Sequence, residues 1–107
     1  SYTSPVQEEQ SLYEIGNYQL DVRRQVLLYN GITQELSYRE TAILHRLCQN
    51  RNCVVNTQDI LLDLWGDDSF FNQRSLHVFI TKLRHKLAKD ESIRIVNVRG
   101  IGYKLIG

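Results

Sequence analysis

The sequence has little of what several classes of protein require. No apolar run is long enough to cross a bilayer, and residues 1–10 show no signal-peptide pattern, so we expect a cytoplasmic protein without a membrane partner. The two cysteines, Cys48 and Cys53, lack the spacing of a zinc knuckle or a redox motif, which indicates reduced, packed thiols. The histidines are scattered, without a nucleophile or metal motif around them. We therefore expect neither an enzyme nor a metal or cofactor site.

A strong net charge is also missing, but the charges are unevenly placed along the 107 residues. The formal net charge is +1, which is low for a protein that binds nucleic acid. Residues 1–36 carry two cations and five acids, residues 37–71 three and five, and residues 72–107 eight and two. The last third thus has a net charge of +6, and we expect this end of a single domain to face a polyanion.

Residues 74–87 have the apolar spacing of an amphipathic helix. The side predicted to be buried contains Leu76, Phe79, Ile80, Leu83 and Leu87. The side predicted to be exposed contains Arg74, His77, Val78, Thr81, Lys82 and His85, with Arg84 on or beside it. Such a face suits a DNA major groove, because phosphates attract cations and base edges offer polar and small apolar contacts, such as a thymine methyl group for Val78. A basic face taken alone is more often solvated surface.

A β-hairpin is predicted after this helix. Residues 93–98 and 103–106 have the composition of strands, and a glycine-containing turn joins them. Gly100 and Gly102 supply positive φ angles or a close approach of two backbones. Arg99 is therefore expected at or near an exposed tip, where its guanidinium can enter a narrow minor groove.

The rest of the chain divides into a tail and a set of regular elements. Residues 1–11 are polar and contain the only proline, so we interpret them as a linker remnant or tail and residues 12–107 as the domain. Strand-like segments lie near residues 12–15, 18–22, 25–29 and 33–36, and Asn30-Gly31 is a strong hairpin turn. A small antiparallel sheet is the simplest outcome.

Two helices are expected between this sheet and the basic helix. Ser37 and Glu40 have the spacing of a capping box, which opens a helix that runs to about residue 49. Thr57 can cap a second helix that Gly66 ends, and Asn72 can cap the third. The sequence thus predicts an α+β fold, a winged helix-turn-helix with an N-terminal four-stranded antiparallel sheet, three helices and a C-terminal β-hairpin wing.

These residues give the chain a resemblance to a known family. From about residue 12 to residue 106 it resembles the DNA-binding effector domains of OmpR/PhoB-type bacterial response regulators. The matching motifs are Leu36-Ser37 with Glu40, Trp65-Gly66, the basic helix of residues 74–87, and Val98-Arg99-Gly100-Ile101-Gly102-Tyr103. The leading sheet separates this family from winged helices that lack it.

The resemblance implies a transcription regulator that binds double-stranded DNA. An N-terminal receiver domain outside this chain would be phosphorylated on an aspartate by a sensor kinase. The residues implied for DNA contact are Arg74, Val78, Lys82 and Arg84, with Arg99 in the wing. The loop before the third helix would touch RNA polymerase, and its residues are Asp67, Asp68, Ser69 and Phe70. Because one reading helix covers few base pairs, we expect a homodimer on adjacent half-sites.

Two positions depart from the family pattern, and one alternative function stays open. His77 stands where an aspartate is common, and Phe79 where a histidine is common. We expect Phe79 to add core packing, and His77 replaces an acid with a group that can carry positive charge below neutral pH. Both departures concern the operator sequence and not the fold. The alternative is a winged-helix module for protein contact without DNA binding, because a fold does not dictate a function. Such a module would be expected to carry apolar residues in place of Arg74, Lys82 and Arg99.

Overall fold

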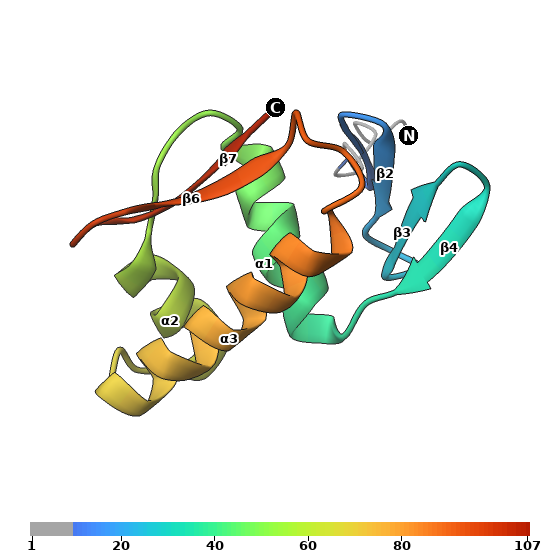
Figure 1. Ribbon diagram of the computed structural model, residues 1–107. Coiled ribbons are helices and arrows are strands. Elements are labelled where there is room, and N and C mark those ends of the chain that lie inside the picture. Colours follow the sequence, from blue (N-terminus) through green and yellow to red (C-terminus); the bar gives the residue numbers. More distant parts are fainter. Residues whose placement is uncertain (1–9) are drawn as a thin grey trace, which may run out of the picture.

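The computed structural model describes residues 10–107, so most of the expected linker of residues 1–11 lies outside the described residues. Ten elements follow one another along the chain (Figure 1). They are β1 (Leu12–Ile15), β2 (Tyr18–Asp21), β3 (Val26–Tyr29), β4 (Ile32–Glu35), α1 (Tyr38–Gln49), β5 (Val55–Asn56), α2 (Thr57–Trp65), α3 (Phe70–Lys86), β6 (Arg94–Val98) and β7 (Gly102–Ile106). The predicted fold is confirmed, and each predicted strand of the first sheet agrees with the observed one to within one residue at each end. Within residues 10–107, no helix is both long and apolar enough to cross a membrane.

The first four strands form an antiparallel sheet with the neighbour order β1-β2-β3-β4. Its strands are joined by short turns, and the Asn30-Gly31 turn lies between β3 and β4 as predicted. Side chains alternate between the two faces of a strand, and on β2 this alternation buries Tyr18 and Leu20 completely or almost completely. Together with Leu27 of β3, these residues anchor the sheet to the core that the helices share.

The helices begin and end at residues that satisfy their free backbone groups. At α1 the capping box is present as predicted: Ser37 Oγ accepts from the Glu40 amide at 3.1 Å, and Glu40 Oε1 accepts from the Ser37 amide at 2.9 Å. Gly66 ends α2 in the left-handed conformation. Isoleucine and leucine side chains of all three helices meet at the centre of the domain, and the fully buried ones are Ile43, Leu44, Leu47, Ile60, Leu61, Leu76, Ile80 and Leu83.

Two of the predicted helix caps are wrong. Asn56, and not Thr57, caps α2, because its extended backbone lets the side-chain oxygen accept from the Gln58 amide at 2.8 Å. Ser69, and not Asn72, caps α3, because its hydroxyl accepts from the Asn72 amide. The third helix therefore begins at Phe70, about one turn earlier than predicted.

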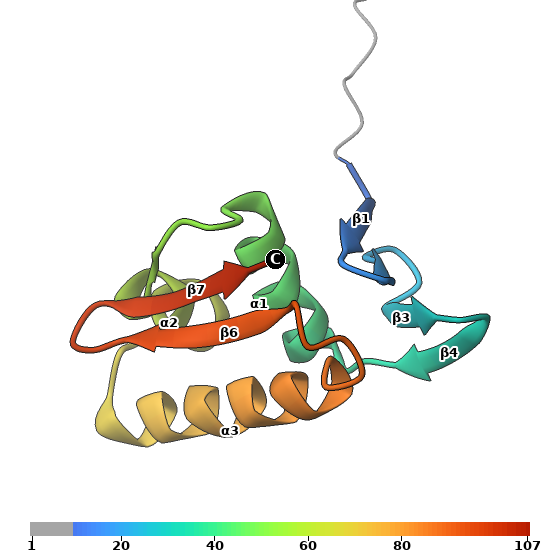
Figure 2. The same cartoon turned by 45° about the horizontal axis from the view of Figure 1, so that its top comes forward.

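The second sheet has the order β5-β7-β6 and carries the predicted hairpin. Figure 2 shows α3 running alongside this hairpin, with β6 nearer to the helix than β7. At Gly102 the hairpin touches the strand that leads into α2, and an added Cβ atom would lie only 1.8 Å from the Val55 carbonyl oxygen. Only glycine permits this approach.

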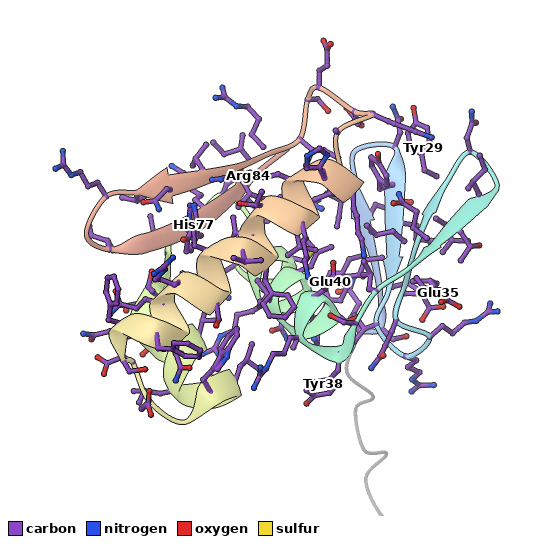
Figure 3. All side chains as sticks on the ribbon, turned by 60° about the horizontal axis from the view of Figure 1, so that its bottom comes forward. Tyr29, Glu35, Tyr38, Glu40, His77 and Arg84 are labelled. Atoms are coloured by element: carbon purple, nitrogen blue, oxygen red, sulfur yellow. The ribbon has the colours of Figure 1, made fainter. Side chains whose placement is uncertain are left out.

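The N-terminal sheet is fastened to the far end of α3. Lys86 Nζ lies 2.9 Å from Glu40 Oε2 of α1 and donates to the Glu35 carbonyl of β4 at 3.1 Å. Asp90, just beyond the helix, accepts from the Asn17 amide of the β1–β2 turn at 2.8 Å. Figure 3 shows Glu35 and Glu40 near the place where the first sheet meets the helices. These contacts fix the sheet against the end of α3 that lies away from the hairpin tip.

The two cysteines have different environments. Cys48 is buried in α1, and burial raises the pKa of its thiol to about 12 against the opposing influence of Arg51. Cys53 is exposed. Both thiols are free, so the prediction of packed thiols is right for Cys48 and wrong for Cys53.

Candidate nucleic-acid interface

The predicted polar face of α3 is exposed over its whole length. Every residue placed on it by the helical spacing is open to solvent, and these residues are Arg74, His77, Val78, Thr81, Lys82 and His85. Val78 is 52% exposed, although it is apolar. The residues of the opposite side that were expected to be buried are buried, apart from the half-buried Phe79.

Two of the exposed residues are already partly engaged within the helix. The Thr81 hydroxyl donates to the His77 carbonyl at 3.0 Å, which leaves its oxygen free to accept another hydrogen bond. The Lys82 ammonium lies 5.3 Å from the centre of the Phe79 ring. That ring in turn packs edge-on against Trp65, with 5.8 Å between the ring centres. The expectation that Phe79 adds core packing is therefore confirmed.

Arg84 occupies a different environment from these residues. It is half-buried, and its Nε donates to the carbonyl of Ile95 in β6 at 2.9 Å. Figure 3 shows Arg84 between α3 and the hairpin. The buried phenol of Tyr103 lies close enough for the Arg84 charge to matter: burial raises the pKa of Tyr103, and Arg84 opposes that shift. Arg84 thus joins the helix to the hairpin instead of projecting from the exposed face.

A hollow of about 630 Å³ separates the first half of α3 from the hairpin. Arg74, His77 and Val78 line it on the helix side, and Ile101 lines it on the hairpin side. The first turn of α2 closes the remaining side, and all residues that line the hollow are neutral or basic. The hollow therefore offers a cationic, partly apolar surface between the two elements that were predicted to bind DNA. His85 lies apart from it, near Lys89 and the N-terminal sheet.

Arg99 lies at the tip of the hairpin, as predicted. It is exposed and directly precedes Gly100, whose φ of +77° turns the chain back. Nothing lies within 4 Å of the position that a Cβ atom of Gly100 would occupy, so this glycine serves the backbone conformation alone. Val98 and Gly100, on either side of Arg99, line the hollow, so the exposed Arg99 lies next to it.

The turn between α2 and α3 is shorter than predicted. Asp67 accepts hydrogen bonds from the Ser69 amide at 3.0 Å and from the Asn72 side chain at 2.6 Å, and these bonds hold the pKa of its carboxyl below the usual range. Asp68 is exposed, and Ser69 is the helix cap. Phe70, expected in the same loop, is the first residue of α3 and lines the hollow.

Sequence reasoning therefore missed Phe70 and Ile101 as neighbours of the basic face. Ile101 follows Gly100 in the turn, and nothing in its spacing indicates that it faces the helix. The position of Phe70 could have been predicted from two spacings. Ser69 stands three residues before Asn72, the spacing of a helix cap, which starts the helix at Phe70. Phe70 stands four residues before Arg74, which places the two side chains on the same face of that helix.

The described part of the chain has no group of three or more histidine, cysteine or acidic side chains that could hold a metal ion. The ion pairs found there fasten elements together, as Arg46 and Asp63 do between α1 and α2. The exposed cations of the α3 face and of the hairpin tip suit the binding of a polyanion.

Comparison with known proteins gives a consistent result. A family model described as "Transcriptional regulatory protein, C terminal" matches residues 31–105. The transcriptional regulatory protein RprY of Bacteroides fragilis is 39% identical over 99 residues, which are 92% of this chain and 42% of that protein. The chain thus spans less than half the length of this curated relative.

Solved structures show the same fold. The DNA-binding domain of CpxR from E. coli superposes with a TM-score of 0.80 at 25% identity, covering 92% of this chain and 98% of that one. The Klebsiella pneumoniae RstA DNA-binding domain, solved in complex with the RstA box, superposes with a TM-score of 0.74 at 25% identity, covering 91% and 98%.

Proposed function

The chain belongs to the family of C-terminal winged-helix DNA-binding domains of OmpR/PhoB-type response regulators, and we propose that its α3 face and hairpin tip bind double-stranded DNA in neighbouring grooves. One observation supports this proposal above the others. Arg74 of α3 lines one side of a hollow that no acidic residue lines, and Val98 and Gly100, the neighbours of the exposed Arg99, line its hairpin side. This family is one of transcriptional regulators and not of enzymes.

The exposed face divides by chemistry into contacts of two kinds. We assign Lys82 to phosphate, because a flexible ammonium group is a point charge without directional preference. Arg74 and His77 carry donors that suit base edges, and Val78 suits a thymine methyl group. Thr81 and His85 extend the same face. Arg99 is assigned to the minor groove, where a narrow A·T-rich segment concentrates negative potential.

The regulatory part of the proposal lies outside this chain. We infer that a receiver domain on the N-terminal side is phosphorylated on an aspartate and controls the effector domain, and that two copies bind adjacent half-sites. The supporting observation is that the chain spans 42% of RprY, which leaves room for a second domain in such a protein. Binding to a chromosome would place the protein in the bacterial cytoplasm.

The short turn before α3 is proposed to contact RNA polymerase. Asp67, Asp68 and Ser69 form a fixed, acidic and exposed turn beside the proposed DNA surface. A partner bound to the same DNA could reach this turn while α3 occupies its groove. The measurement is transcription from a bound promoter, in which Asp68→Ala should reduce activation and leave DNA affinity unchanged.

The DNA proposal is tested by titrating random duplex DNA at several salt concentrations. Wild type should bind, and log K should fall linearly with log salt concentration. Arg74→Ala should weaken binding, whereas Arg24→Ala, an exposed arginine in the β2–β3 turn, should leave it unchanged. No binding, or equal losses in both variants, would overturn the proposal and favour the alternative of a protein-contact module.

A further inference from the structure

The first residue of α3 lies on the same side of the helix as the proposed reading residues. Phe70 stands four residues before Arg74 and seven before His77, which places the three side chains on one stripe of the helix. All three line the hollow between α3 and the hairpin. We propose that the Phe70 ring contacts DNA as the first reading residue of α3, and not a protein through the turn that precedes it. This inference rests on the proposed function.

The environment of Phe70 is difficult to explain by packing. The side chain is 73% exposed, so its ring contributes little to the hydrophobic core. Phe71 is equally exposed, at 77%, but it is one position round the helix and does not line the hollow. Of these two adjacent, exposed aromatic rings, only the Phe70 ring faces the proposed DNA surface.

The chemistry of the hollow favours nucleic acid over an apolar protein segment. Arg74 places its guanidinium carbon 6.0 Å from the centre of the Phe70 ring, so a cation and an apolar surface stand side by side. Val78 adds apolar surface on the α3 side of the hollow, and Ile101 adds it on the hairpin side. No carboxylate lines the hollow. DNA offers the matching pattern, because its thymine methyl groups and sugars lie between phosphates.

The position of Phe70 also extends the surface that the helix can read. Eight residues separate Phe70 from Val78, which is about 12 Å along the helix axis. That length corresponds to between three and four base-pair steps at about 3.4 Å each. Phe70 would therefore contact DNA at the outer edge of the half-site, several steps from the thymine proposed for Val78.

The test compares Phe70→Ala with Phe71→Ala on a duplex that wild type has selected from a random pool. Phe70→Ala should weaken binding roughly tenfold, the loss expected for one buried aromatic contact, and Phe71→Ala should change it less than about twofold. Phe70→Leu should recover most of the affinity, because it restores an apolar group. Thermal unfolding of the alanine variants should match wild type, since both rings are exposed.

The salt dependence separates a direct contact from an effect through Arg74. An apolar contact releases no counterion, so the slope of log K against log salt concentration should be the same for Phe70→Ala and wild type. A slope lower by about one unit would mean that the loss runs through an Arg74–phosphate contact, and the direct contact would be refuted. Wild-type affinity in Phe70→Ala, or equal losses in Phe71→Ala, would also refute it. Failure of wild type itself to bind any duplex would instead refute the proposed function.

Discussion

Arg84 of α3 donates from Nε to the main-chain carbonyl of Ile95 in β6 at 2.9 Å, and this bond ties the basic helix to the hairpin. Arg84→Ala should therefore lower the free energy of unfolding by about 1–2 kcal/mol, because a half-buried carbonyl loses a charged donor. DNA affinity should fall as well, since the hairpin loses its fixed place beside the helix. Urea denaturation and duplex titration measure the two effects.

Lys82, two residues earlier, should affect DNA binding without affecting stability. Its ammonium is exposed, so Lys82→Ala should change the free energy of unfolding by less than about 0.5 kcal/mol. It should weaken all duplexes alike and reduce the salt slope by about one unit, as the loss of one phosphate contact requires. A change of sequence preference at constant slope would identify Lys82 as a reader of bases.

Arg99→Ala tests the proposed minor-groove contact. The variant should fold normally, because the side chain is exposed at a turn. It should lose about 1–3 kcal/mol of binding free energy and any preference for A·T pairs beside the major-groove site. Selection of bound duplexes with both proteins measures the preference. An unchanged flank preference would mean that the tip is only solvated.

Glu40 should make folding sensitive to acid. Its carboxylate is 5% exposed, and burial acts to raise its pKa, but Lys86 and the hydrogen bonds from Ser37 prevail and hold the pKa below the ordinary 4.5. The stabilisation is therefore complete above that value and is lost as the pH falls through the lower pKa of the folded state. Glu40→Gln should cost on the order of 1–3 kcal/mol at neutral pH and progressively less in acid.

The control for this experiment is Glu35→Gln. Glu35 binds Lys86 through its main-chain carbonyl, which the substitution retains, and its side chain is exposed. Its free energy of unfolding should follow that of wild type at every pH. If the two variants showed the same pH dependence, the buried ion pair would not be the cause.

The cysteines should react with an alkylating reagent one at a time. At mildly alkaline pH the folded protein should accept one label, on Cys53, because Cys48 is buried and its pKa is raised to about 12. Two labels should appear after unfolding in urea. Mass spectrometry of the digested protein identifies the labelled residue, and rapid labelling of Cys48 in the folded state would contradict the buried position.

The architecture could be predicted from sequence because its signals are local. The capping box at Ser37 and Glu40, the Asn30-Gly31 turn and the apolar spacing of the helices each depend on neighbouring residues only. These patterns located the elements and the exposed face of α3.

The predictions that were wrong concern positions where two residues compete for one role, or where a segment distant in sequence decides the direction of a side chain. Ser69 and Asn72 are both good caps, and the choice falls to Ser69, while Asn72 donates its side chain to Asp67. Arg84 lies on the edge of the helical face, and only the position of β6 decides that it points toward the hairpin. Neither the cap of α3 nor the direction of the Arg84 side chain can be predicted from the local sequence alone.

The contacts of Gly102 and Arg84 together fix the position of both strands of the hairpin. Arg84 holds β6 from the side of α3, and the contact of Gly102 with Val55 holds β7 from the side of α2. A hairpin fixed through both strands can bend at its tip but cannot swing as a whole. The distance between the Arg99 tip and the α3 face is then fixed by the fold. A duplex would have to adjust its groove width and its bend to this distance. Sequences that deform easily would therefore be selected even where no side chain touches a base.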